Sequence, residues 1–310
     1  MEAAEKWDEP VFGPGRYMGR RQSVAALARS LLAGSSVTVL GGAKIGKTSL
    51  LRQVALEMGE CAAVLSGPDL MMHPGALTDA VKRLKVASRP CLLVDDADAL
   101  AIPDGRGVLV ALASLAREGA AGLQVALCFA GTRRWQEATA NPGCPLLCGG
   151  VHLKPFPMAV WDRRLAGALI AQAAPGAPVS HVGALISLAG NHPFLLRGLL
   201  TRGPDIDAAL EACRGGFERA FASWLDQMGP GVSADDGGLD ARPLMRLLVE
   251  RPTYIAFDSA RRRLARPDLK AEADLLCWLG VVDRRLRGDE ATATLRAGCG
   301  LFNEWYRARA

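Results

Sequence analysis

The chain has 310 residues, of which 50% are hydrophobic and 22% are charged, a composition typical of a folded protein with more than one domain. The sequence contains no run of about 18 apolar residues, so we expect no membrane-spanning helix. The first ten residues are acidic and polar and lack the features of a secretory signal, so we expect a cytoplasmic protein.

The eight cysteines form no CxxC pair. Several of them lie in apolar stretches, so we expect small buried side chains in a reducing compartment.

The positive charge is concentrated at the C-terminal end of the chain. Residues 241–310 carry 14 basic and 9 acidic residues and so account for the whole formal charge of +5, because residues 1–240 carry 23 of each. This distribution indicates a separate C-terminal module with its own partner. A solvated charged surface and an anionic partner such as DNA are the two interpretations.

In the first half of the chain, helical spacing alternates with short apolar runs, as in an open parallel α/β sheet. We expect helices over residues 22–33, 48–58, 75–86 and 107–117, a loop over 68–74, and strands over 36–40, 62–65, 91–94, 124–130 and 151–153. The run at 91–94 is apolar throughout and ends in two aspartates, as expected of a central strand.

After Pro157 the pattern becomes helical. We expect helices over 159–173, 181–189, 193–201 and 205–226, a Gly- and Asp-rich linker over 229–242, helices over 243–250, 256–265 and 270–279, and then two strands. Three helices followed by a hairpin outline a winged helix. The predicted domains are an α/β domain (1–157), a helical lid (158–228) and a winged-helix domain (241–310).

The strongest local signal is residues 41–48, Gly-Gly-Ala-Lys-Ile-Gly-Lys-Thr, which fit the P-loop pattern GxxxxGK[ST] between a predicted strand and helix. Glycines let backbone N–H groups curve around phosphates, and the helix N-terminus favours the same anion. Lys47 is expected to reach the β- and γ-phosphates, and Thr48 to bind magnesium. The alternative, a glycine-rich turn with a coincidental Lys-Thr, is disfavoured by the strand–loop–helix context.

A second signal is Leu-Leu-Val-Asp-Asp at 92–96, an apolar strand ending in carboxylates like a Walker B motif. Asp95 is expected to hold magnesium and Asp96 to polarise the attacking water. The alternative is that both carboxylates cap the following turn, but the upstream P-loop favours the magnesium role for Asp95. Asp98 is expected to cap a helix or turn.

Polar residues also follow the strand at 124–130. Thr132 would lie at the ligand-binding edge of a parallel sheet, where it could orient the attacking water. Arg133 could neutralise charge in the transition state. The alternative is a solvated loop containing Arg133 and Arg134.

Together these motifs resemble the STAND class of AAA-like ATPases, particularly its archaeal-type ATPase group, over nearly the whole chain. Residues 17–20 resemble the [FY]xGR box that lies against the base, and 41–51 resemble the P-loop of the group. Residues 190–196 resemble the GNP box of the lid, whose proline packs on the adenine. The resemblance and the P-loop pattern imply that the nucleotide is bound by Tyr17, Gly19, Arg20, Gly41, Gly42, Ala43, Lys44, Ile45, Gly46, Lys47, Thr48, Ser49, His192 and Pro193.

Two positions depart from the pattern of this group. Arg21 stands where an acidic residue usually follows the GR box, and Asp96 stands where glutamate is usual. These departures bear on turnover more than on binding. His192 is expected to help form the wall around the base, to start a helix beside Pro193 with Asn191 as N-cap, or both.

The sequence therefore predicts a P-loop NTPase of the AAA-like type that binds ATP or ADP with Mg²⁺. As a slowly hydrolysing switch, it would use nucleotide state to control the lid, the winged helix and assembly with a protein partner or with further copies. One alternative is a DNA-binding ATPase of the origin-recognition or transposition-helper type, using Arg261, Arg262 and Arg263. Another is a nucleotide-locked scaffold without turnover.

Overall fold

The protein divides into two compact units in a computed structural model. The residues described are 9–11, 13, 20–73, 75–84, 88–118, 125–201, 205–229, 239–251, 253–266, 269–287 and 289–309. Pro10–Gly41 and Gly46–Met158 form the α/β unit; Gly42–Ile45 and Ala159–Ala310 belong to the C-terminal unit. Within the described residues, every helix is too short or too polar to span a bilayer.

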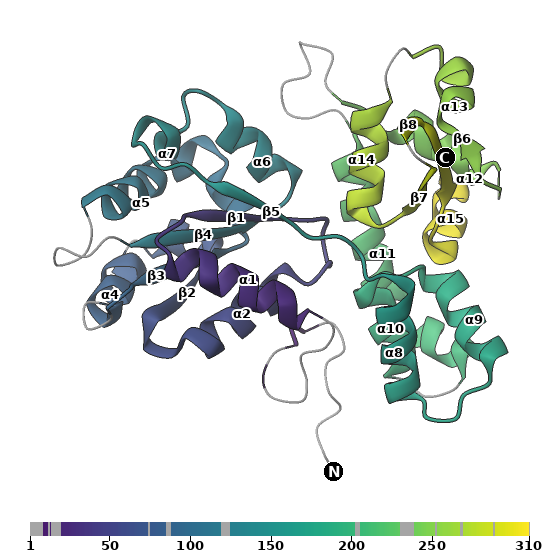
Figure 1. Ribbon diagram of the computed structural model, residues 1–310, viewed down its shortest axis with the longest axis horizontal. Helices are drawn as coiled ribbons and strands as arrows, with labels where there is room; N and C mark the ends of the chain where they lie inside the picture. The colour runs from purple at the N-terminus through teal and green to yellow at the C-terminus, as the bar shows by residue number, and fades with distance from the viewer. Residues whose placement is uncertain are drawn as a thin grey trace. The chain divides into compact units, whose positions relative to one another are not determined.

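The α/β unit is built on a five-stranded parallel sheet with the order β2-β3-β4-β1-β5 (Figure 1). The strands are β1 (Val37–Leu40), β2 (Ala62–Ser66), β3 (Cys91–Asp95), β4 (Ala126–Gly131) and β5 (Lys154–Pro157). The three central strands, β3, β4 and β1, are buried along their whole length, as expected of parallel strands covered on both faces. The predicted α/β class is confirmed.

Helices flank this sheet in Figure 1. They are α1 (Arg21–Leu32), α2 (Lys47–Met58), α3 (Gly67–Met72), α4 (Gly75–Leu84), α5 (Arg106–Glu118), α6 (Arg133–Ala140) and α7 (Pro145–Cys148), with short 3-10 turns η1 (Gly59–Cys61), η2 (Ala97–Leu100) and η3 (Pro103–Gly105). The predicted loop over 68–74 is wrong, because α3 occupies most of it. The Ser66 hydroxyl accepts a hydrogen bond from the Asp69 amide at 3.3 Å, and Pro68 lies in the first turn; both features favour a helix start.

The predicted strand over 151–153 is also misplaced, since β5 is Lys154–Pro157. Two prolines in a strand argue against a central position, because each lacks the N–H that a ladder needs. β5 is an edge strand that pairs with β1 alone. At an edge, one side of the strand needs no partner, and the prolines are tolerated.

The C-terminal unit begins with α8 (Arg163–Ala173), α9 (Val179–Ala189), α10 (Pro193–Leu200) and α11 (Ile206–Met228). It continues with α12 (Arg242–Val249), β6 (Ile255–Ala256), α13 (Phe257–Leu264), α14 (Lys270–Leu279), β7 (Val282–Arg287), β8 (Asp289–Ala297) and α15 (Gly300–Arg307). The small antiparallel sheet has the order β6-β8-β7. The three helices and the hairpin follow the predicted order; β6 and α15 were not anticipated. Of the predicted linker, residues 230–238 lie outside the described residues.

One hydrophobic core runs from α8 to α15 within this unit. At its centre Phe221 and Trp224 of α11 lie against Phe302 of α15, with ring centroids 5.4 and 5.6 Å apart. Trp305 and Trp278 are partly buried against the same core. The predicted lid and the segment after the linker therefore share one core.

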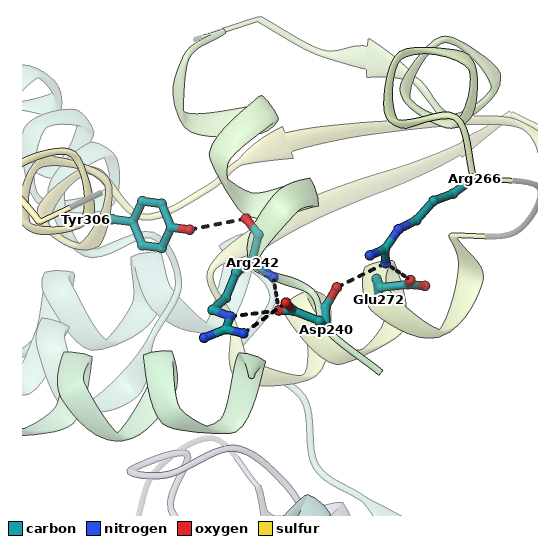
Figure 2. A network of polar contacts seen from close by, with 5 residues as sticks. All are labelled: Asp240, Arg242, Arg266, Glu272 and Tyr306. Atoms are coloured by element: carbon teal, nitrogen blue, oxygen red, sulfur yellow. Dashed lines mark hydrogen bonds and ion pairs between the residues drawn. The ribbon is translucent and has the colours of Figure 1, made fainter. Parts of the chain in front are cut away.

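Polar contacts join the helices around this core (Figure 2). Arg242 donates from Nε and Nη2 to the two carboxylate oxygens of Asp240, at 2.8 and 2.9 Å. These hydrogen bonds lower the pKa of the Asp240 carboxyl below its usual range. Arg266 donates to Glu272 at 2.7 Å and to the Asp240 carbonyl at 3.2 Å, and the Tyr306 hydroxyl donates to the Arg242 carbonyl at 3.1 Å. These contacts of partly exposed arginines link the segments before α12 and after α13 to α14 and α15.

Replacing Phe302 with alanine should lower the unfolding free energy by about 3–5 kcal/mol, because the ring is fully buried among aromatic neighbours and the truncation leaves a cavity. Urea denaturation measures the change. Val179→Ala is the control, since Val179 is 89% exposed and its truncation should cost less than about 0.5 kcal/mol. Equal effects of the two changes would contradict the central place of Phe302.

Candidate nucleotide-binding site

The P-loop joins the end of β1 to the start of α2. Gly46, the N-cap of α2, has a φ of 99°, and Lys44 has a φ of 64°. No atom within 4 Å would obstruct a Cβ at Gly46, so its dihedral angle, not the available space, requires glycine. Lys44 is a non-glycine residue in the left-handed region, which stores backbone strain. This is the curled conformation that a phosphate-binding loop needs.

Lys47 begins α2 and turns back toward the loop, where its ammonium donates to the Gly41 carbonyl at 2.8 Å. Burial of the ammonium lowers the pKa of Lys47, and the nearby carboxylates of Asp98, Asp95 and Asp96 oppose that shift. The side chain as a whole is half-buried. Lys47 thus contacts the loop and interacts electrostatically with three acids at the end of β3 and just after it.

Asp95 is the last residue of β3, and its side chain is buried. Burial and then the neighbouring Asp96 raise the pKa of Asp95, while a hydrogen bond with Thr48 lowers it. Oδ1 of Asp95 is buried and has no hydrogen-bond partner among the described residues. A hydroxyl beside a carboxylate with a spare buried oxygen fits Mg²⁺, which takes one or two protein oxygens together with water and phosphate.

Asp96 follows with an exposed side chain and a φ of 48°. The left-handed conformation is tolerated best by glycine, asparagine and aspartate. A Cβ at Gly67, at the start of α3, would lie 2.5 Å from the Asp96 carbonyl oxygen, so the chain after β2 packs directly on this bend. The bend turns the second carboxylate out of the sheet, where a water molecule can reach it.

Thr132 and Arg133 lie where β4 ends and α6 begins. The Thr132 hydroxyl donates to Asp98 at 2.5 Å, and Arg133 Nε donates to Glu137 at 2.6 Å. The Arg133 side chain is only 12% exposed. Asp98 also accepts from the backbone amides of Thr132 and Trp135, which confirms it as a helix cap. The loop interpretation of this segment is wrong, because Arg133 and Arg134 belong to α6.

The predicted contacts at the start of the chain are only partly described. Tyr17 and Gly19 lie outside the described residues. Arg20 is the N-cap residue of α1, and its carbonyl accepts from the Val24 amide at 3.0 Å. The Ser49 hydroxyl accepts from the Val11 amide at 2.9 Å, so Ser49 ties the N-terminal segment to α2.

Gly42–Ile45 of the P-loop and the predicted lid box both belong to the C-terminal unit. Within it, Trp224 Nε1 donates to the Ala43 carbonyl at 3.0 Å, and the Lys44 ammonium lies 5.2 Å from the centre of the Phe194 ring. Ile45 is fully buried. A Cβ on Gly42 would lie 3.0 Å from the Leu279 Cα, so a larger residue at position 42 would have to displace backbone.

The lid box starts α10. His192 is the N-cap residue and Pro193 takes the first helical position. Asn191 as N-cap is therefore wrong, since proline fixes the helix start at the residue after His192. The His192 ring is fully buried, with its centroid 4.6 Å from that of Trp224. His192 therefore lies in the interior of the C-terminal unit.

The sequence did not reveal Trp135 or Thr38 as parts of this site. Trp135 is fully buried, and its Nε1 donates to the Thr38 hydroxyl of β1 at 2.9 Å. A Cβ on Gly131 would come within 2.4 Å of the Trp135 side chain. The only sequence signal was a threonine inside an otherwise apolar strand, because a buried hydroxyl needs a partner.

Comparison with known proteins gives a fold and no family. No family model matches the sequence, and no curated protein matches it. Among solved structures, a Walker-type ATPase of Pyrococcus abyssi is similar with a TM-score of 0.62 and 14% identity, over 96% of this chain and 98% of that one. The ORC2 protein of Aeropyrum pernix, solved in ADPNP and ADP complexes, has a TM-score of 0.50 and 15% identity, over 98% and 97%. The chain has the fold of an AAA-like P-loop ATPase.

In magnesium-free buffer, Asp95→Asn should raise the unfolding free energy near neutral pH by about 0.5–2 kcal/mol. The carboxylate is buried beside Asp96 and its folded-state pKa is raised, so ionised Asp95 opposes folding above that pKa. The gain should shrink as the pH falls below it, because Asp95 is then protonated when folded. Thermal unfolding between pH 4 and 8 measures the change.

Asp104→Asn is the matched control, because Asp104 is exposed and its neutralisation should change little at any of these pH values. A loss of stability in Asp95→Asn at neutral pH would show that Thr48 and Lys47 stabilise the ionised carboxylate by more than burial costs.

Proposed function

We propose that this chain binds ATP with Mg²⁺ at the P-loop and hydrolyses it slowly, as the switch of a larger assembly. The observation that carries the proposal is the Thr48–Asp95 contact. It brings the Walker A hydroxyl against the Walker B carboxylate, with a buried carboxylate oxygen left over for a cation. The lysine that would neutralise phosphate lies beside the same acids.

Each residue type suits a different part of the bound nucleotide. Backbone amides of the curled loop would surround the phosphates, assisted by the N-terminus of α2. The Lys47 ammonium would exchange the Gly41 carbonyl for the β- and γ-phosphates, a charged acceptor that binds it more strongly. Thr48 and Asp95 would hold Mg²⁺, which would supply positive charge against the negative charge that develops on the phosphates.

Hydrolysis would use Asp96 as the base that polarises water, since its carboxylate is exposed just beyond the magnesium position. Arg133 would stabilise charge on the γ-phosphate. In the structure Arg133 is engaged by Glu137, so a phosphate would have to compete with that ion pair. This competition, together with aspartate in place of the usual glutamate, supports slow turnover.

A switch of the STAND class fits the C-terminal unit. The predicted lid, with Pro193 and His192, and the predicted winged helix share one core. Packed cores move as rigid bodies because they do not deform continuously. A lid that responded to the γ-phosphate would therefore carry the C-terminal module with it and present a different surface to a partner protein or to further copies of the chain.

The structure gives less support to DNA as a partner. Arg261 pairs with Asp258 at 3.4 Å, and Arg266 with Glu272 at 2.7 Å. Arg284 forms a charged hydrogen bond with Asp274 at 2.5 Å. Such internal pairs favour a neutralised protein surface over phosphate contact. Two exposed arginines of α13, Arg262 and Arg263, are the residues through which contact with DNA would be made.

Lys47→Ala should weaken Mg²⁺-ATP binding by about 30-fold or more, because it removes a charge that contacts phosphate in a dry site. Titration calorimetry with ATP measures it. Lys82→Ala is the matched control, since Lys82 is an exposed lysine of the same unit, where it pairs with Asp79 at 3.3 Å. Unchanged ATP affinity in Lys47→Ala would overturn the assignment of the site.

For the switch, Asp96→Ala should bind ATP and retain it, because the base is gone while the phosphate contacts remain. Size-exclusion chromatography coupled to light scattering should then show a change in mass or radius with ATP and none with ADP. Wild type should show the same change more briefly. Identical elution of Asp96→Ala with ATP, with ADP and without nucleotide would contradict a nucleotide-controlled assembly.

A further inference from the structure

Asp98 caps a helix to which it does not belong. It lies in η2, just beyond the two Walker B carboxylates, and its Oδ1 accepts from the Thr132 amide, the Thr132 hydroxyl and the Trp135 amide at 3.1, 2.5 and 3.1 Å. Its Oδ2 accepts from the Thr132 amide at 2.9 Å. Thr132, the N-cap residue of α6, makes no side-chain capping bond of its own. The start of α6 is thus held from the Walker B segment.

The same turn of α6 is fixed on its other side by Trp135. The indole donates to Thr38 of β1 at 2.9 Å, packs on Phe129 of β4 with centroids 4.8 Å apart, and closes over Gly131. The first turn of α6 is therefore locked between η2, β4 and β1. β1 is the strand that leads into the P-loop.

Asp98 also acts electrostatically on the P-loop lysine. Among the three carboxylates that oppose the lowered pKa of Lys47, Asp98 has the largest effect. One carboxylate therefore holds the start of α6 from the turn that follows the Walker B strand, and it acts electrostatically on the lysine that would bind the phosphates. Capping alone would not require an aspartate from the Walker B segment, because any acceptor near the first amides of the helix can cap it.

The hydrogen bonds also change the expected role of Thr132. Its amide and its hydroxyl both donate to Asp98, so the hydroxyl proton is directed to the carboxylate and not to a water molecule. The next residue, Arg133, is the first residue of α6, so these hydrogen bonds fix the backbone from which its side chain extends. Thr132 is then part of the support, and Arg133 is the group that reaches the phosphate.

We propose that Asp98 is a positioning residue for the γ-phosphate site: through Thr132 and Trp135 it fixes the first turn of α6, and so the direction of Arg133, relative to the Walker residues. The inference rests on the proposed ATP-binding function, which it extends by assigning a residue beyond the two Walker B acids. Asp98 contributes to recognition of the γ-phosphate, whereas the P-loop binds the phosphates that ATP and ADP share.

The test is Asp98→Asn. An amide of the same shape cannot accept from Thr132 and Trp135 with both of its polar atoms, because its NH₂ group would face an N–H donor. Single-turnover hydrolysis of Mg²⁺-ATP should slow by about 10- to 100-fold, the effect of a misplacement near 1 Å. Affinity for ADP should change by less than about threefold, because ADP lacks the group that Arg133 contacts, and preference for ATP over ADP should fall.

Two comparisons separate positioning from stability. Asp205→Asn removes the charge of another capping aspartate, which accepts from Asp207 and Ala208 at the start of α11; it should leave hydrolysis and nucleotide preference as in wild type. In an Arg133→Ala background, Asp98→Asn should cause little further loss, because residues that act through one another are not additive.

Hydrolysis and ATP preference within about twofold of wild type in Asp98→Asn would overturn the inference. A full second loss in the Arg133→Ala background would overturn it as well. Failure of the wild-type chain to bind ATP would instead count against the proposed function, and the binding titration distinguishes that result from both others.

Discussion

The ammonium of Lys47 interacts electrostatically with the carboxylates of Asp98, Asp95 and Asp96, at and just beyond the end of β3. Charges of one sign gathered in a partly dry place repel one another, and a single lysine offsets only part of that repulsion. Packing of the sheet must therefore offset the free energy of this repulsion. The fully buried β1, β3 and β4 supply that packing.

Backbone strain and an unsatisfied hydrogen-bond acceptor occur together at the end of β3. Asp96 has a positive φ angle, and Asp95 Oδ1 is buried without a hydrogen-bond partner among the described residues. Each of these features costs stability in isolation, and such costs persist where the surrounding structure over-determines them. A bound cation would satisfy the unpartnered oxygen of Asp95. These features are consistent with the proposed nucleotide site.

The C-terminal unit solves a different problem, since it must join several short helices and a small sheet without a long strand ladder. It does so with one aromatic-rich core and with arginines that bind neighbouring carboxylates and carbonyls. The formal excess of positive charge in this part of the sequence is therefore partly structural. Net charge describes solubility and long-range attraction, and the pairing of individual arginines decides whether a surface is free to bind phosphate.

The sequence by itself determined the α/β class, most of the elements, the P-loop, and Asp95 at the end of a buried strand, because these depend on periodicity and on residue types at fixed local spacing. It could not place β5, whose prolines are tolerated only at a sheet edge, or α3, which depends on a capping hydroxyl at Ser66. Only the tertiary structure brought Asp98 to the start of α6 and Trp135 to Thr38. Those contacts join segments far apart in the chain. A local sequence pattern cannot predict them, because it does not specify which distant residues will become neighbours on folding.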